Sequence, residues 1–556
     1  MKFKQILTVI SIIGCTGLCA CSDSLLDIEQ MGVKSEQNSY ITDQDAEQAI
    51  AAVYRRFRQA YCGKGESGDD FAQGFWLKNL LSDELLPGGN SPQDQQGIQE
   101  LGCSEVQANN SFILEYYKRL YHTIYLANIV IEHFENSTSD IKLRDVAEAK
   151  FFRAMCHFEL VTLWGNPPLV TKVLTTPEQQ RAANTPAEET WAQIEKDLND
   201  AINSGKMASK ADVNDTETTT RATREAAQAL LGKALLYQKK YALAKEQFLN
   251  VIKSKKYELV DDISVFYHVE GSGSNEYVFE CNRHKDDVNR PHQGGALTIL
   301  CNWPFGECIQ GSDSWKFYLF NNSGYGFFHP TKKLYDAFVA EEGVDGYRLN
   351  QSIKTFQQQV KMDIYYNHVE TFNLKGTEGL FRFKWLPTTR DEVFESWAGS
   401  EATTPVMRYA DVLLMMSEAC LLSGDQQNAD KYLNEVRNRA KLTRKSDVTL
   451  TDIKTERNLE LAMEGVRYQD LIRWGDAPVE LADKGKKYPV YWVWADPTND
   501  YNTVDGRENA QYVPNLVYEN RASDLAGWTP GRDELLPYPQ DEVNVNPNIK
   551  QNPGYN

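Results

Sequence analysis

Pairs of helical segments joined by short turns recur along this chain of 556 residues and constrain its fold most strongly. In the first pair, residues 223–237 carry a run of alanines with Gly232, and residues 241–252 carry aromatic side chains. Small residues let two helices cross closely, and an aromatic second helix then fills the contact. A similar pair spans residues 409–422 and 429–440. The sequence therefore predicts a mainly α fold, a superhelix of tetratricopeptide-like helix pairs.

A charged segment, residues 452–475, follows the second pair. Its apolar residues recur at helical spacing and predict one helix packed against other helices: Leu459, Ala462, Met463 and Val466. Glu460 and Glu464 fall one turn apart on another face of that helix. Like charges at this spacing repel, so we expect a cation between them, with Arg437 and Arg439 as candidates. We interpret the pair as part of an inter-helix ion network rather than as a catalytic acid and base.

The N-terminus has the pattern of a lipoprotein signal. Two lysines precede the apolar run 6–13, and Leu18-Cys19-Ala20-Cys21 then forms a lipobox. A plain signal peptide cleaved after Ala20 is the alternative, but the cysteine at this position favours lipidation of Cys21. Lipid chains would hold the protein on a membrane without spanning it. No later apolar run is long enough for a transmembrane helix.

Charge and motif spacing exclude several other kinds of site. The formal net charge of -19 argues against nucleic acid as a partner, because nucleic acid requires a basic face. Cys281, His284, Cys301 and Cys308 are a possible zinc set, but they lack the paired spacing of a zinc knuckle. The segment 212–215 lacks the glycine and distal glutamate of a calcium loop. We therefore predict no metal site and no cofactor.

A His residue and an aromatic-rich region complete the candidates. His157 lies on a largely apolar helical face without a metal partner at i+4, so we interpret it as a hydrogen-bonded core residue.

Residues 256–404 interrupt the helical pattern and are rich in Gly, Asn, Asp and aromatic residues. Exposed rings on loops held by a rigid frame stack on sugar rings, while amides and carboxylates bind the hydroxyl groups. Any single ring could instead fill the core of its own region. A second aromatic cluster comprises Tyr488, Tyr491, Trp492, Trp494, Tyr501 and Tyr512.

A series of short motifs, in order along almost the whole chain, resembles the SusD/RagB family of Bacteroidetes outer-membrane lipoproteins. The motifs are the lipobox at Cys21 with Leu25-Leu26-Asp27, Ser82-Asp83-Glu84, the helix from Phe151 to Gly165, Asn275-Glu276-x-x-Phe279-Glu280, Pro330-Thr331-x-x-Leu334-x-Asp336-x-Phe338, Arg408 to Met415, Asn434-x-Val436-Arg437-x-Arg439-Ala440, residues 452–475, and the terminus from Leu536-Pro537-Tyr538-Pro539 to Tyr555. His157 and Tyr538 depart from the residues usual in the family.

The resemblance implies a fold and a function. Family members are right-handed arrays of tetratricopeptide-like helix pairs that support a loop-rich ligand-binding region. They are not enzymes; they bind glycans, or peptides in some relatives, and cover a SusC-like TonB-dependent transporter. The expected location is the outer membrane, lipid-anchored and facing the extracellular side. Glycoside hydrolysis is a rival function, but no carboxylate pair stands out in an aromatic loop context.

The resemblance also implies a division of the chain, but it carries no transferable set of ligand contacts, so these are drawn from the loop next to Ser82 and from the central interruption. We expect a signal peptide at 1–20, a lipidated tether at 21–40, a helical region at 41–255, a loop-rich ligand-binding insertion at 256–404, and a helical region with a C-terminal tail at 405–556. Asp83 and Asn90 are included among the contacts because desolvated hydroxyl groups require polar partners. The predicted oligosaccharide contacts are Trp76, Asp83, Asn90, Trp303, Phe305, Trp315, Tyr325 and Arg390; no catalytic residue is predicted.

Overall fold

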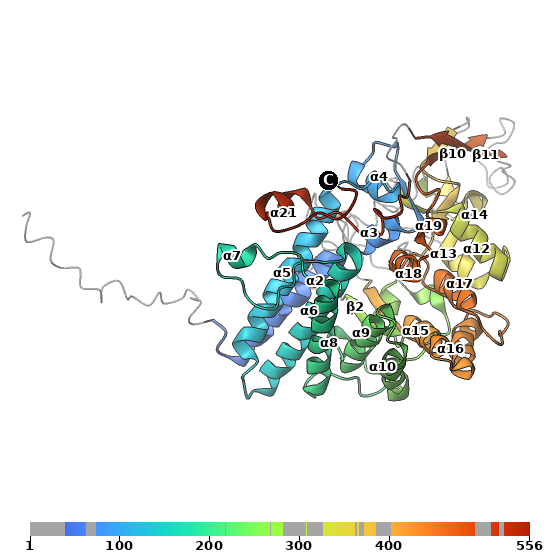
Figure 1. Cartoon of the computed structure of the whole chain (residues 1–556). Coiled ribbons are helices and arrows are strands. Elements are labelled where there is room, and N and C mark those ends of the chain that lie inside the picture. Colours follow the sequence, from blue (N-terminus) through green and yellow to red (C-terminus); the bar gives the residue numbers. More distant parts are fainter. Residues whose placement is uncertain are drawn as a thin grey trace, which may run out of the picture.

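Most of the described chain is α-helical, which confirms the predicted fold class (Figure 1). The computed structural model describes residues 39–62, 74–216, 218–266, 268–281, 307–308, 326–361, 364–365, 372–384, 402–494, 513–521 and 527–555. None of the described helices combines the length and apolarity that a membrane span requires.

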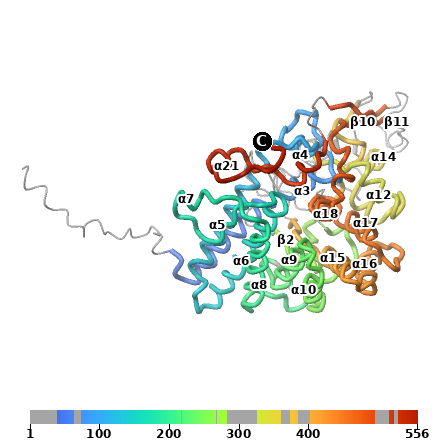
Figure 2. The backbone as a smooth tube through the Cα atoms, in the orientation of Figure 1, coloured from blue at the N-terminus to red at the C-terminus, as the bar shows by residue number. Residues whose placement is uncertain are grey.

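The N-terminal part is a stack of helices that run side by side (Figures 1 and 2). Among the described helices, the two longest are α5 (Ser111–Phe134) and α6 (Asp140–Trp164). The side chain of Asn110 caps the N-terminus of α5 by accepting hydrogen bonds from the backbone N–H groups of Phe112 and Ile113. The second helix ends at Gly165, whose φ of 77° suits a residue without Cβ. The elements are α2 (Asp43–Cys62), α3 (Gly74–Leu81), β1 (Leu85–Gly88), α4 (Gln96–Gly102), α5 (Ser111–Phe134), α6 (Asp140–Trp164), α7 (Pro177–Gln180), α8 (Ala187–Asn203) and η3 (Thr218–Thr220).

The two predicted helix pairs are present. The first pair is α9 (Arg224–Tyr237) with α10 (Tyr241–Ser254), and the second is α15 (Tyr409–Leu422) with α16 (Gln426–Arg439). Gly232 lies at the first crossing, where an added Cβ would come within 2.5 Å of Cε1 of Phe248. The small residue therefore sets how closely α9 and α10 approach.

The segment 452–475 is not the single helix that its apolar spacing predicts. Helix α17 (Leu450–Glu460) ends at Glu460, and α18 (Arg467–Trp474) begins six residues after Leu461. Between them, Met463 and Gly465 have φ angles of 62° and 75°, in the left-handed region that interrupts a right-handed helix. Glu460 and Glu464 are therefore not one helical turn apart, and that part of the prediction is wrong.

Small antiparallel sheets and short helices fill the rest of the described chain. Strand β10 (Lys487–Trp494) pairs with β11 (Val513–Asn520) on one side and β7 (Phe372–Lys375) on the other. Two-stranded sheets join β1 to β4 (Phe327–Pro330), β2 (Tyr277–Cys281) to β9 (Thr404–Arg408), β3 (Glu307–Cys308) to β6 (Ile364–Tyr365), and β5 (Ile353–Thr355) to β8 (Leu380–Arg382). The remaining elements are η4 (Ile263–Val265), η5 (Val269–Gly271), α12 (Lys332–Glu342), α13 (Tyr347–Ser352), α14 (Phe356–Lys361), α19 (Ala477–Glu480) and α21 (Gln540–Val545).

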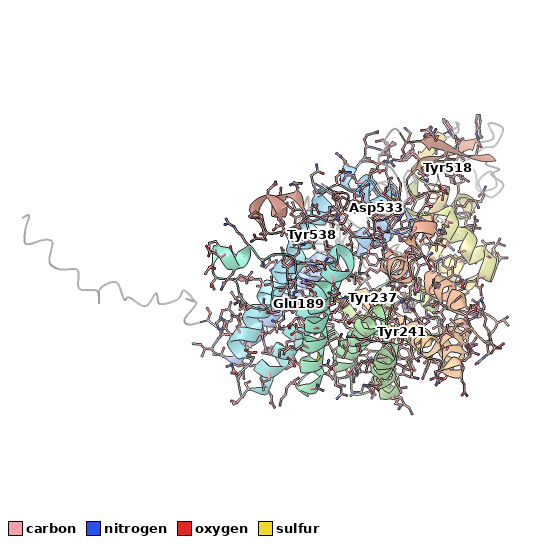
Figure 3. All side chains as sticks on the ribbon, viewed as in Figure 1. Glu189, Tyr237, Tyr241, Tyr518, Asp533 and Tyr538 are labelled. Atoms are coloured by element: carbon pink, nitrogen blue, oxygen red, sulfur yellow. The ribbon has the colours of Figure 1, made fainter. Side chains whose placement is uncertain are left out.

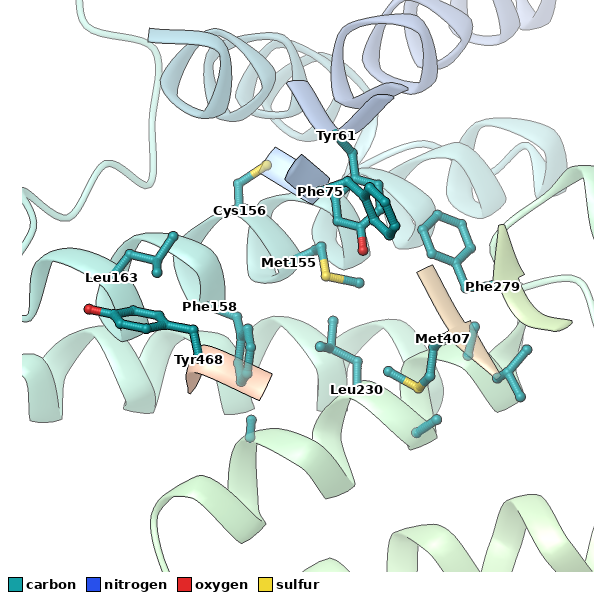
Figure 4. Close-up of a cluster of buried hydrophobic side chains, with 14 of the residues drawn as sticks. Tyr61, Phe75, Met155, Cys156, Phe158, Leu163, Leu230, Phe279, Met407 and Tyr468 are labelled. Atoms are coloured by element: carbon teal, nitrogen blue, oxygen red, sulfur yellow. The ribbon is translucent and has the colours of Figure 1, made fainter. Parts of the chain in front are cut away.

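One apolar cluster connects both ends of the chain, from Ala46 to Ile549. Side chains of α6, such as Phe158, meet Leu230 of α9 and Tyr468 of α18 in its middle (Figure 4). The N-terminal and C-terminal helices therefore share a core and support the loops and sheets together.

Candidate functional site

Five of the predicted ligand contacts lie outside the described residues: Trp303, Phe305, Trp315, Tyr325 and Arg390. The same holds for Cys21, the predicted lipidation site, and for His284 and Cys301 of the possible zinc set. These assignments stay predictions. Of the contacts that the structure describes, Trp76, Asp83 and Asn90 come from one stretch around the end of α3 and β1.

Trp76 is a core residue in this structure. Its side chain on α3 is 3% exposed, and its ring stacks on Phe328 with ring centroids 4.6 Å apart. The guanidinium carbon of Arg382 lies 4.7 Å from the Trp76 ring centroid, a cation–π contact. Protein groups thus occupy the ring, and the structure argues against a ligand contact there.

Asp83 is largely buried, whereas Asn90 is exposed. Asp83 accepts from Nε of Arg467 at 2.9 Å and pairs with Nζ of Lys333 at 2.8 Å. Burial acts to raise the pKa of Asp83, but Arg467 and Lys333 outweigh it and lower the pKa to about 2. Asn90 is exposed in the loop after β1, where its backbone N–H donates to Asp94. The structure places Asp83, but not Asn90, on the wall of a groove.

This groove, which we call the Asp83 groove, has a volume of about 610 Å³. The end of α3 and the start of β1 form one wall, and the first turn of α12 forms another. Helix α19 and the segment leading into β10 close the opposite side. The residues around it are Ser82, Asp83, Leu85, Leu86, Gly102, Thr331, Lys333, Glu378, Val479, Glu480, Asp483, Lys484, Gly485, Lys486, Lys487, Pro489 and Tyr518.

Charged groups of both signs lie along the groove in fixed positions. Lys333 bridges Asp83 and Glu480, with 2.5 Å between its Nζ and Oε2 of Glu480. At the floor, Nζ of Lys484 donates to the backbone carbonyls of Leu80 and Ser82 at 2.6 and 2.8 Å. Burial lowers the pKa of Lys484 to about 8. The groove therefore offers hydrogen-bond donors and acceptors close together without a dominant charge.

Tyr518 supplies an aromatic surface at the edge of the groove. It lies on β11, 43% exposed, and its hydroxyl donates to Oε1 of Glu378 (Figure 3). A ring held by a hydrogen bond at its tip keeps its orientation while its face stays accessible. An aromatic face beside polar groups is the arrangement that binds a sugar ring.

The carboxylates of Glu460 and Glu464 belong to an ion network, not to this groove. Arg408 lies between them, with Nη1 at 3.0 Å from Glu460 and Nη2 at 2.7 Å from Glu464. Arg439 pairs with Glu460 and Glu276 rather than with Glu464, so its predicted place is confirmed only at Glu460. The prediction for Arg437 is wrong, because it pairs with Glu341 and Glu456.

The network keeps its carboxylates ionised. Burial acts to raise the pKa of Glu460, but Arg439, Arg408 and Arg348 hold it well below its usual range. A carboxyl group that cannot take up a proton at neutral pH is a poor general acid. The adjoining cavity, lined in part by Phe266 and Arg408, has a volume of about 20 Å³, enough for one water molecule and too small for a sugar. These acids tie helices together.

No group of three or more metal-binding side chains occurs among the described residues. Five of the cysteines that the structure describes are buried: Cys62, Cys103, Cys156, Cys281 and Cys420. Because burial also raises the pKa of Cys103 to about 11, and of Cys420 likewise, these two are protonated and poor metal ligands.

Sequence reasoning missed most of the groove. Tyr518, Glu378, Lys333 and Lys484 come from four separate segments, and none of these segments carries a local motif for ligand binding. Asp83 was the one predicted contact on its wall. Tyr518 reaches the groove because the register of β11 against β10 pairs it with Pro489, and this register is known only from the fold.

Comparison with known proteins decides the family. The SusD family model matches residues 275–555, just over half of the chain. This chain belongs to the SusD family. A second family model, described as starch-binding and associating with the outer membrane, matches residues 36–236. Membership also confirms the resemblance that the motifs indicate.

Individual members of the SusD family are similar over most of their length. A SusD-like protein of Bacteroides ovatus is 24% identical, covering 96% of this chain and 95% of its own. The starch-binding protein SusD of Bacteroides thetaiotaomicron is 25% identical, with 88% of this chain and 87% of its own covered. The solved structure of a laminarin-binding SusD-like protein aligns with a TM-score of 0.73 at 25% identity, covering 92% of this chain and 99% of its own.

Proposed function

We propose that this SusD-family protein binds oligosaccharides at the surface of the outer membrane and delivers them to a SusC-like TonB-dependent transporter. The Asp83 groove is the observation that carries the proposal. It combines the exposed ring of Tyr518 with donors and acceptors on Lys333, Glu480 and Lys484. Starch and laminarin are the polysaccharides named for two relatives. Their sugar rings have apolar faces flanked by hydroxyl groups, which complement an aromatic ring beside hydrogen-bond donors and acceptors.

Anchoring is part of the same proposal. Lipid on Cys21 and the polar segment after it would tether the helical body to the outer membrane, facing outward. The family model that matches residues 36–236 is described by association with that membrane. Two lipid chains give stable anchoring without a spanning helix.

We propose binding without catalysis. Three of the four described carboxylates that line the groove are engaged by neighbours: Asp83 by Arg467 and Lys333, Glu480 by Lys333, and Glu378 by Tyr518. The fourth, Asp483, is exposed and pairs with Lys486. A glycoside hydrolase needs one carboxyl group that stays protonated beside one that is ionised. The low pKa of Asp83 suits an ion pair rather than a proton donor. The family resemblance implies peptide binding as the alternative function, and the test below distinguishes it from glycan binding.

An array of glycans and peptides tests this function, followed by calorimetry with laminarin and starch oligosaccharides. We expect glycan binding, weakened about tenfold by Tyr518→Ala, because one stacked ring contributes about 1 kcal/mol or more. Tyr125→Ala is the matched control, since Tyr125 is 45% exposed on α5, a different part of the molecule.

Three outcomes would contradict the proposal. Binding of peptides alone would replace the ligand class. New reducing ends after incubation with polysaccharide would show catalysis. Unchanged glycan affinity in the Tyr518→Ala variant, with a normal melting temperature, would place the site away from the Asp83 groove.

A further inference from the structure

The sheet β7–β10–β11 has a second face that the groove does not use. Along a strand, alternate residues share a face, so Trp492 and Trp494 of β10 lie on one face, roughly 7 Å apart. Trp494 is 51% exposed and Trp492 is half-buried. By the register of the hairpin, Tyr518 pairs with Pro489 and lies on the opposite face, toward the groove. The hairpin lies at the periphery, at the opposite side of the view from α7 (Figure 1).

Asparagines flank the first tryptophan on both neighbouring strands. Trp492 pairs directly with Asn373 of β7 and with Asn515 of β11. Directly paired residues point to the same face of a sheet, so both amides lie beside the Trp492 ring. Asn515 is exposed and Asn373 is half-buried. Neither side-chain amide hydrogen-bonds to another described residue, which leaves a donor and an acceptor on each side of the ring.

The charge of this face fits an uncharged ligand. The next cross-strand rows carry one exposed cation, Lys375, and one exposed anion, Glu519, on the same face as Trp492. Val517, 39% exposed, extends the apolar surface beside the tryptophans. An anionic polysaccharide or a nucleic acid would require an excess of basic residues, which the described residues of this face lack.

The cluster of aromatic residues that the sequence places here divides into two sets. Tyr488 and Tyr491 are core residues, 3% and 7% exposed. Tyr501 and Tyr512 lie outside the described residues. The two tryptophans remain as surface rings, and with Val517 they form a contiguous apolar surface of the kind that marks binding sites.

We propose that Trp492, Trp494, Asn373 and Asn515 form a second carbohydrate subsite for a neutral pyranose oligosaccharide, on the face of the sheet opposite the Asp83 groove. The inference rests on the proposed function. The tryptophans stack on the apolar faces of successive sugar units, and the asparagine amides bind hydroxyl groups. Two contact points on one protein raise the apparent affinity for a polymer more than for a short oligosaccharide, because the second contact is intramolecular.

The test compares the Trp492→Ala/Trp494→Ala variant with the wild-type full chain, using laminarin, starch and their six-unit oligosaccharides in calorimetry. We expect the affinity for the bound polymer to fall about tenfold and that for its oligosaccharide to change less. Trp494→Phe keeps an aromatic face and should lose less affinity than Trp494→Ala. Tyr125→Ala, an exposed ring on α5, serves as the control, and melting temperatures verify folding.

The outcomes separate this inference from the proposed function. Wild-type protein that binds no carbohydrate in the array or in calorimetry overturns the proposed function and this inference with it. If the wild type binds carbohydrate and the double substitution changes the affinity for the polymer by less than about twofold, this inference alone is overturned. A double variant that keeps carbohydrate affinity but loses self-association in light scattering would make the face an interface between copies, and would also overturn it.

Discussion

At the scale of single residues, the imidazole of His157 is buried without a hydrogen-bond partner in the part of the chain that the structure describes. His157 is 0% exposed on α6, in the core as predicted, but neither ring nitrogen has a hydrogen-bond partner among the described residues. Burial, with a contribution from Arg153, lowers its pKa to about 3. The prediction of a hydrogen-bonded core histidine is therefore wrong in its second half. An unpaired buried polar group costs about 1–3 kcal/mol.

Replacing this imidazole should stabilise the protein and change how its stability depends on pH. We expect His157→Leu to raise the free energy of unfolding by about 1 kcal/mol at pH 7, because the unpaired nitrogens are gone. The pKa of His157 in the folded protein lies below its unfolded value of about 6.5. As the pH falls below 6.5 the unfolded chain takes up the proton first, so the free energy of unfolding of the wild type decreases on acidification and is unaffected by this proton above pH 6.5. Urea unfolding at pH 5, 6, 7 and 8 measures both effects.

The two unfolding curves should diverge on acidification. Between pH 6.5 and 5 the wild type should lose up to about 1.4 kcal/mol per pH unit more than the variant. His329, also buried with a pKa of about 3, remains in both proteins and cancels in the comparison. Parallel pH dependences would show that His157 is solvated or hydrogen-bonded in the folded protein.

At the scale of secondary-structure elements, the packing of helix pairs depends on single small residues. Gly232 of α9 faces Phe248 of α10, and a Cβ at position 232 would overlap that ring. Alanine has the higher helix propensity by about 1 kcal/mol, so propensity and packing act in opposite directions at this position. Packing should dominate, because both residues are fully or nearly fully buried between the two helices.

We expect Gly232→Ala to lower the free energy of unfolding by about 1–3 kcal/mol through overpacking against Phe248. Phe248→Leu alone should also destabilise, because it leaves a cavity. The double variant should be less destabilised than the sum of the two single variants by about 0.5–3 kcal/mol. Chemical denaturation of all four proteins measures this coupling, and additive effects would refute the contact.

At the scale of the whole molecule, the C-terminal tail, residues 536–552, hydrogen-bonds to the end of α6 in the N-terminal half of the chain. The side-chain amide of Asn552 donates to the backbone carbonyls of Trp164 and Leu536 at 3.1 and 2.7 Å. The indole of Trp164 donates to the carbonyl of Pro537 at 2.9 Å, and the hydroxyl of Tyr538 donates to the carbonyl of Trp164 (Figure 3). These contacts join the end of α6 to residues almost 400 positions later.

Removing one of these contacts should weaken the whole fold. Asn552→Ala should lower the free energy of unfolding by about 1–3 kcal/mol, because the buried carbonyl of Leu536 loses its amide donor. Asn548→Ala is the matched control: its exposed amide donates to the carbonyl of Arg181, and we expect a change within about 0.5 kcal/mol. Thermal and urea unfolding measure both. Equal effects would show that the tail contributes no more than a surface contact.

Local sequence by itself determined the helical part of this protein. The small and aromatic residues of α9 and α10, and the stop at Gly165, are effects of neighbours within a few turns, so periodicity and turn residues predict them. The ordered motifs likewise predicted the family that the comparisons show. The apolar spacing of 452–475 failed between Glu460 and Arg467, because the left-handed backbone of Met463 and Gly465 leaves no trace in hydrophobic spacing.

Only the tertiary structure decided which partners meet. The cation between Glu460 and Glu464 is Arg408, which lies more than 50 residues earlier, so no local spacing could identify it. Trp76 is a residue type that often binds sugar rings, but Phe328 of β4 and Arg382 of β8 pack against it and bury it. Tyr518 and Trp494 belong to one hairpin and face opposite ways. Strand register, a long-range property, assigns each ring to one face of the sheet, and the packing over that face decides whether the ring is buried, like Tyr488, or exposed, like Trp494.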